Sequence, residues 1–199
     1  MHSSNSFSKK FLNLISFQNW EPIHWTGVVV SALSRVLPHP PNFTPVGAMS
    51  LYAGARVQGW NSYLVPILSL FMSDFALSKI HGYDLFHDTL PIIYGSFLFN
   101  VFLGKKFLAE SSSFLKTGIL AAIASTQFYL VSNFGVWAIS DMYPKSWEGL
   151  IACYIAALPF FQMTFLSDLI YSGILFGVLD GLEIRAGRSL SKPVSWAHN

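Results

Sequence analysis

The chain has 199 residues, of which 52% are hydrophobic and only 11% are charged, and its mean hydropathy is +0.46. Soluble domains carry about 25% charged residues, and a soluble domain of this composition would expose large apolar patches. The composition therefore predicts a protein that crosses a membrane several times, and it excludes nucleic-acid readers, soluble enzymes and disordered linkers. The net charge of +2 indicates no partner, and the single cysteine excludes internal disulfides and a cysteine-based zinc site.

The N-terminal residues 1–22 are basic and lack the long apolar region and small-residue cleavage site of a signal peptide, so we expect a cytoplasmic tail. The first helix is predicted at Ile23–Leu37. Three prolines within Pro38–Thr44 exclude a continuous helix there and predict a turn. A short second helix is expected at Pro45–Val57.

Four longer apolar segments follow. We expect helices at Trp60–Ser78, Thr89–Lys105, Phe114–Ser140 and Pro159–Leu179. A spanning helix needs roughly 20 apolar residues, whereas Gly149–Leu179 has 31 and would be about 46 Å long as one helix. We expect Pro159 to divide this segment, and the part before it to be interfacial or re-entrant. The predicted fold is an all-α, six-helix transmembrane bundle over residues 23–180, with one extra helix before the last span and a cytoplasmic tail over 181–199.

The Lys and Arg residues predict an orientation in the membrane. With both termini in the cytoplasm, the predicted inner segments hold nine of them and the predicted outer segments hold three. Cytoplasmic loops of membrane proteins carry such an excess. We therefore expect a multi-pass protein of the cell membrane with both termini inside.

A polar stripe lies on the last predicted helix. A carboxylate at the centre of a span costs about 2.5–3.5 kcal/mol, and Asp168 follows Pro159 by nine residues, about 13 Å along a helix. Thr164, Tyr171 and Ser172 share its helix face, because they lie three or four residues away. The stripe is either a functional site or an interhelical hydrogen bond made by a protonated Asp168.

Other polar side chains are expected at a similar depth, in the outer half of the bilayer. Asp74 is placed about 7 Å below the outer surface and Asn133 about 9 Å from the outer end of its helix. As alternatives, Asp74 snorkels to water and Asn133 only packs helices. Together they predict a pocket open to the outside, roofed by Pro38–Thr44 and Ser140–Trp147. The predicted substrate-binding residues are Asn42, Asp74, Asn133, Trp137, Tyr143, Asp168 and Tyr171.

Small residues spaced by four allow helix backbones to approach closely. Gly27 and Ser31 on the first helix are our first choice for a face that docks another membrane protein. Packing within the bundle is the alternative for this pair.

The remaining candidates indicate no chemistry. His81, Asp84, His87 and Asp88 are expected to form an ordinary polar loop rather than a metal site, and Asp180 to be solvated at the inner end of the last helix. The chain has no G-x-S-x-G, H-E-x-x-H or P-loop motif. We therefore expect neither an enzyme nor an ATPase, and no cofactor.

Four segments resemble an uncharacterised family of bacterial membrane proteins. They are LPHPPNFTPVGAMSLYAGA (37–55), VPILSLFMSD (65–74), SNFGVWAISDMYP (132–144) and GLIACYIAALPFFQMTFLSDLIYSGILFG (149–177). That family is similar to the substrate-binding S components of energy-coupling-factor (ECF) vitamin transporters in its six helices, its small-residue face and its proline-rich turn. The resemblance covers about Ile23–Leu179.

The resemblance implies a function. S components bind a vitamin or related micronutrient in the outer half of the membrane, and then dock on a transmembrane coupling protein driven by ATPase subunits. They often present Ala-x-x-x-Ala on the first helix, where this chain has Gly27 and Ser31 at the same spacing. The resemblance also implies a bacterial inner membrane.

The leading hypothesis is therefore a membrane subunit that binds a small, partly polar micronutrient for uptake. Its aromatic side chains would stack on a ring, and its amides and carboxylates would orient the ligand. Two other classes stay open. One is a stand-alone proton- or ion-coupled carrier that uses Asp74 and Asp168, and the other is a ligand-free membrane scaffold or assembly protein.

Overall fold

The computed structural model describes residues 22–82, 84–111 and 113–185, which are helical and contain no strand. The helices are α2 (Pro22–Val36), α3 (Val46–Arg56), α4 (Asn61–His81), α5 (Leu90–Phe107), α6 (Phe114–Ile139) and α7 (Trp147–Ile174), followed by the π-helical segment η2 (Leu175–Leu179) and the short α8 (Asp180–Arg185). The all-α prediction is confirmed for these residues. Of the tails predicted at 1–22 and 181–199, residues 1–21 and 186–199 lie outside them, while Pro22 begins α2 and residues 181–185 belong to α8.

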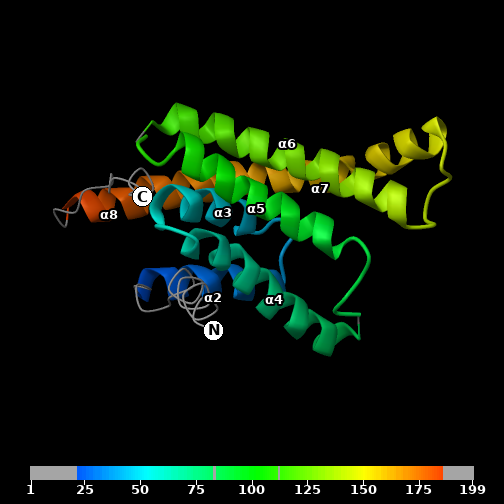
Figure 1. The fold of residues 1–199 in the computed structure, drawn as a ribbon, viewed down its shortest axis with the longest axis horizontal. Helices are drawn as coiled ribbons and strands as arrows, with labels where there is room; N and C mark the ends of the chain where they lie inside the picture. Colours follow the sequence, from blue (N-terminus) through cyan, green and yellow to red (C-terminus); the bar gives the residue numbers. More distant parts are fainter. Residues whose placement is uncertain (1–21, 83, 112, 186–199) are drawn as a thin grey trace, which may run out of the picture.

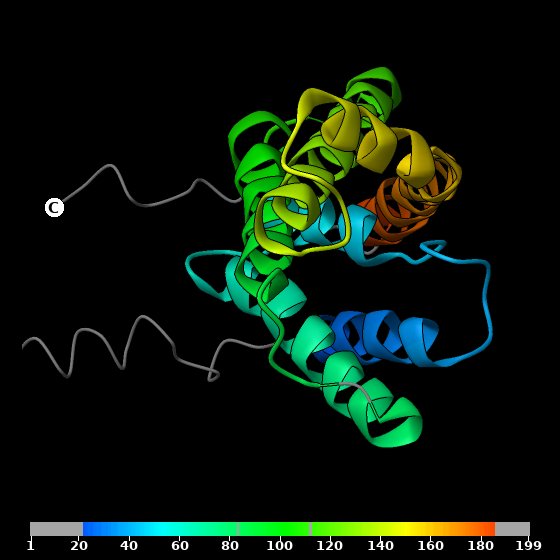
Figure 2. The same ribbon diagram turned by 90° about the vertical axis from the view of Figure 1, so that its right-hand side faces the viewer.

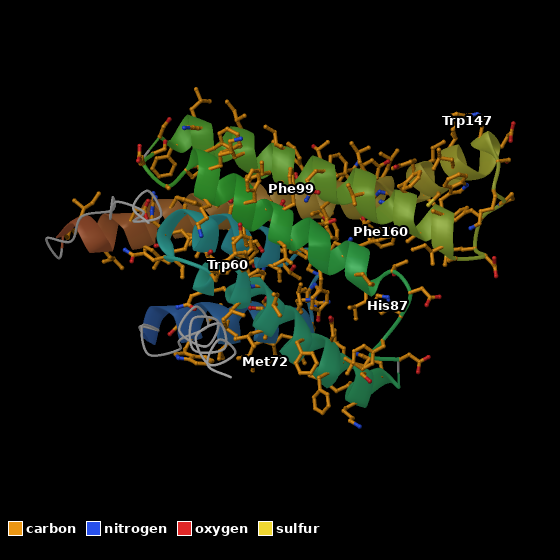
Figure 3. The ribbon with its side chains drawn as sticks, viewed as in Figure 1. Trp60, Met72, His87, Phe99, Trp147 and Phe160 are labelled. Atoms are coloured by element: carbon orange, nitrogen blue, oxygen red, sulfur yellow. The ribbon has the colours of Figure 1, made fainter. Side chains whose placement is uncertain are left out.

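Within the part of the chain that the structure describes, three helices are long and apolar enough to cross a membrane. They are Asn61–His81, Phe114–Ile139 and the continuous helical stretch Trp147–Leu182. Apolar side chains also cover much of the outside of the bundle, including Met72, Phe99 and Phe160, which are labelled in Figure 3. An outward apolar surface is what lipid chains solvate best. The six predicted spans remain a prediction.

The short helix α3 is the centre of the bundle. Every residue from Val46 to Ala55 is buried, and the helix packs against α4, α5, α6 and α7. Seen from the end of the bundle, α3 lies between the outer helices, and the connection from α2 crosses one side to reach it (Figure 2). With 11 residues, α3 is only about 16 Å long. Helix α3 therefore covers only part of the length of the molecule, and the α6–α7 hairpin extends beyond it (Figure 1).

Glycines bring α3 and α5 into backbone contact. A Cβ added to Gly54 would overlap the carbonyl oxygen of Val101, and one added to Gly104 would overlap the carbonyl oxygen of Leu51. Small residues permit such close approach between helices, and van der Waals packing then stabilises the pair. This contact fixes α5 against the central helix.

Helix α7 corrects the sequence prediction. It runs without interruption from Trp147 to Ile174, with Pro159 inside it, so the separate interfacial or re-entrant helix predicted before Pro159 is wrong. Ser146 caps the true start, because its hydroxyl accepts a hydrogen bond from the backbone N–H of Gly149 at 3.3 Å. A proline removes one helical hydrogen bond, but packing against neighbouring helices preserves the helix in membrane proteins, and α7 packs against α6.

The contact between α3 and α5 is tested by a pair of substitutions in one helix. Gly104→Ala forces the backbones apart, and we expect it to destabilise the protein by about 1–3 kcal/mol. Gly95→Ala is the matched control, because a Cβ there meets nothing within 4 Å. The thermal unfolding midpoint in detergent should fall only for Gly104→Ala. Equal midpoints for the two variants would contradict the close approach.

Candidate functional site

The start of α3 meets a buried carboxylate from α7. Asp168 is only 2% exposed, and its carboxyl group fills the space where a Cβ of Gly47 would lie. The backbone N–H of Ala48 hydrogen-bonds to this carboxyl group. The first turn of a helix has free N–H groups and a partial positive charge. Asp168 therefore satisfies a helix end that water cannot reach, and Gly47 provides the room for it.

The loop before α3 lies against the same face of α7. The ring of Phe43 packs on that of Tyr171, with 5.7 Å between centroids. The neighbouring Asn42 is exposed and has a left-handed backbone with φ of 62°, a conformation that Asn tolerates better than most residues. Three predicted site residues, Asn42, Asp168 and Tyr171, thus belong to one region at the start of α3. We call this region the α3 entrance, formed by residues 38–48, Asp168 and Tyr171.

Asp74 belongs to a different group. Its carboxylate forms an ion pair with Arg35 at 2.7 Å and accepts a hydrogen bond from the hydroxyl of Tyr94 at 2.9 Å. The Arg35 guanidinium also donates to the hydroxyl of Ser73 at 2.5 Å. These contacts join α2, α4 and α5. Arg35 precedes Asp74 by 39 residues in the sequence, so no local pattern indicated that the two would pair.

Asn133, Trp137 and Tyr143 form a third group in the α6–α7 hairpin. The Asn133 amide donates to the carbonyl oxygen of Tyr129 in its own helix at 2.8 Å. The Trp137 indole donates to the carbonyl oxygen of Pro144 at 2.9 Å, in the turn that holds the half-buried Tyr143. The contacts of the seven predicted residues therefore fall into three groups rather than one pocket.

The predicted depths also change. Because α7 is continuous from Trp147, Asp168 lies 21 residues beyond the start of the helix, about 31 Å along it, rather than nine residues beyond a helix start at Pro159. Asn133 and Trp137 lie in the α6–α7 hairpin, which reaches farther along the molecule than α3 does (Figure 1).

The docking face proposed for the first helix is inside the bundle. Gly27 and Ser31 are buried, and a Cβ on Gly27 would contact the sulfur of Met49 in α3 at 3.1 Å. The alternative of packing within the bundle is the one that the structure supports. A partner therefore cannot dock on these two residues without parting α2 from the central helix.

The other end of α3 contains a buried ion pair that sequence reasoning missed. The Arg56 guanidinium binds both carboxylate oxygens of Asp180, at 2.9 and 2.5 Å, and it also donates to backbone carbonyls at residues 108, 109 and 111. Asp180 is 5% exposed, so the expectation of a solvated residue is wrong. In the sequence, this ion pair is marked only by the position of Asp180 directly after the apolar segment that ends at Leu179.

In its described residues, the loop between α4 and α5 shows no arrangement suited to a metal ion. No group of three or more His, Cys, Asp or Glu residues suited to a metal ion occurs among the described residues. His87 hydrogen-bonds instead to the hydroxyl of Thr89 at 2.9 Å.

A family model matches residues 18–190 of the chain. The chain therefore belongs to DUF6580, described as a family of unknown function. No curated protein matches the chain, and no solved structure matches it.

The buried ion pair at the end of α3 is tested by removing one partner. Asp180→Ala leaves Arg56 as an unpaired buried charge, and we expect it to cost about 3–5 kcal/mol of stability. Glu110→Ala is the control, because this acid is exposed and such changes usually stay within about 0.5 kcal/mol. The loss of stability in each variant is measured as the change in unfolding free energy in mixed micelles. Similar losses for the two variants would show that the ion pair stabilises little.

Proposed function

We propose that the chain is a membrane subunit that binds a small, partly polar micronutrient for uptake, and that the ligand binds at the α3 entrance. The observation that carries this proposal is a short helix that starts inside the bundle with a buried carboxylate at its N-terminus. Transporters commonly build their binding sites where helices are interrupted within the membrane, because free backbone groups are available there. An ionisable residue within a span is by default a functional candidate.

Each group at the α3 entrance has a role in the proposed site. The carboxylate of Asp168 accepts a hydrogen bond from an amine or a ring N–H of the ligand. The rings of Tyr171 and Phe43 flank its apolar part, and the amide of Asn42 contacts it at the mouth. Aromatic walls with a few convergent polar groups are typical of small-molecule sites. No bond is made or broken, so the proposal requires no catalysis.

The other predicted site residues take positioning roles in this proposal. Asp74 holds α2 to α4 and α5 through Arg35, and Asn133, Trp137 and Tyr143 shape the α6–α7 hairpin. Energised uptake would come from other subunits, because the sequence has no P-loop motif. A transmembrane coupling protein with ATPase subunits would supply it. The charge bias of the sequence supports an orientation with both termini in the cytoplasm, and the family resemblance implies a bacterial inner membrane.

A second candidate function rests on one further observation. Among the described residues, the ion pairs are those of Arg35 with Asp74 and Arg56 with Asp180, so Asp168 is buried without a cation. Acids within membrane spans serve as proton carriers in transporters. On this alternative the chain is a stand-alone proton-coupled carrier that uses Asp168 and not Asp74.

The proposed site is tested by native mass spectrometry of the protein purified from its own host. We expect a small molecule at near-stoichiometric occupancy on the wild type. Asp168→Asn and Tyr171→Ala should each lower that occupancy at least several-fold, because they remove an acceptor and an aromatic wall from the site. Asp141→Asn is the matched control, since Asp141 is exposed in the hairpin turn. Equal occupancy in all four proteins would place the ligand elsewhere.

Reconstitution distinguishes the two candidates. In pure liposomes under a proton gradient, the binding subunit alone should give no transport of the molecule identified by mass spectrometry. A stand-alone carrier gives uptake that the proton gradient drives and that Asp168→Asn abolishes. Gradient-driven uptake by the lone protein would therefore overturn the binding-subunit proposal in favour of the carrier.

A further inference from the structure

Helix α7 presents an amide to its outer, apolar face. Gln162 is exposed and has no hydrogen-bond partner among the described residues. It lies 15 residues after Trp147, about 22 Å along the helix, within a stretch apolar enough to span a membrane. Trp147 itself lies at the far end of the hairpin (Figure 3). Lipid chains offer an amide no hydrogen bond, so exposure of this group to lipid is unfavourable.

The residues around Gln162 form a regular seam. The seam consists of Ile151, Ile155, Leu158, Gln162, Leu166, Leu169 and Gly173. Successive members are three or four residues apart, which places them on one helix face with the spacing of a helix–helix seam. The first five are exposed and Leu169 is half-buried. A Cβ on Gly173 would meet nothing within 4 Å, so this end of the seam has open space for another helix.

The opposite side of α7 is already used. Cys153 and Ala157 are buried, and α7 packs against α6 and α3. The hydroxyl of Tyr154 donates to the carbonyl oxygen of Leu130 in α6 at 2.7 Å. The seam therefore lies away from the packed side and is exposed from Ile151 to Leu166, whereas Leu169 also packs against the hydrophobic core.

We propose that this seam binds a second copy of the chain, α7 against α7, with the two Gln162 amides hydrogen-bonded to each other. An amide carries both a donor and an acceptor, so it is complementary to itself across a two-fold axis. Copies that insert with the same orientation meet with Gln162 opposite Gln162. One polar residue within an apolar seam also fixes the register of two helices. Self-complementarity is what favours a second copy over an unrelated membrane protein.

Cysteine cross-linking tests the contact in native membranes, using the full chain. With Cys153→Ser as the background, Leu158→Cys places a thiol on the seam, and mild oxidation should give a covalent dimer. Phe160→Cys is the matched control, because Phe160 is also exposed but lies on another face of α7. A Leu158→Cys product joined to a different protein, or dimers from both variants in equal yield, would overturn the proposal.

The contribution of the Gln162 amide to the dimer is tested by measuring the dimerisation affinity of fluorescently labelled protein in lipid bilayers. Interhelical hydrogen bonds in membranes contribute enough that Gln162→Leu should weaken the dimer by about 3- to 30-fold, while Gln162→Asn retains part of the affinity. Thr126→Val is the control, since Thr126 is exposed on α6 and its hydroxyl donates to the carbonyl oxygen of Ala122 in the same helix. Unchanged affinity for Gln162→Leu, or a wild type that stays monomeric, would refute the proposed dimer.

Discussion

A short helix buried at both ends imposes the main constraint on this structure. The first N–H groups and the last carbonyls of a helix have no partner within it, and neither lipid nor a packed interior supplies water. Helix α3 is buried from Val46 to Ala55, so its ends need polar partners from other elements. Asp168 supplies the partner at the start. At the other end, the cationic Arg56 closes α3, pairs with Asp180 and donates to carbonyls of the segment that follows α5. The rest of the bundle is arranged around these two contacts.

Both carboxylates come from one continuous helical stretch. Asp168 and Asp180 are 12 residues apart, about 18 Å in a helix, which is close to the length of α3. A helix broken at Pro159 would not carry the α6–α7 hairpin and both contacts in one piece. On the opposite side, Gly54 and Gly104 let α5 approach the backbone of α3. The central helix is thus held by polar contacts at its ends and by close packing along its side.

The sequence predicted the positions of the helices well, because local features mark them. Long apolar segments and the prolines of Pro38–Thr44 placed α2 to α6 within a few residues of their actual bounds. The continuity of α7 was missed, because whether a proline interrupts a helix depends on the packing around it. Local patterns cannot show that packing.

The site was predicted less well than the fold, for a physical reason. Polar side chains in apolar helices are recognisable, and Asp74, Asn133 and Asp168 were recognised as such. Their partners are set by tertiary contacts, however, as with Arg56 and Asp180, which are 124 residues apart in the sequence. Helical periodicity placed Tyr171 on the face of Asp168, but it could not tell that Trp137 would bind the nearby turn.

The most direct test of the account asks whether the α3 entrance closes over a ligand. An Asn42→Cys variant, with Cys153→Ser as the background, is labelled in membrane vesicles by a thiol reagent that does not cross membranes, with and without a low-molecular-weight extract of the host. We expect slower labelling of Asn42→Cys in the presence of the extract and no change for Met142→Cys, which lies exposed in the hairpin turn. Equal labelling of Asn42→Cys under both conditions would contradict a ligand site at the α3 entrance.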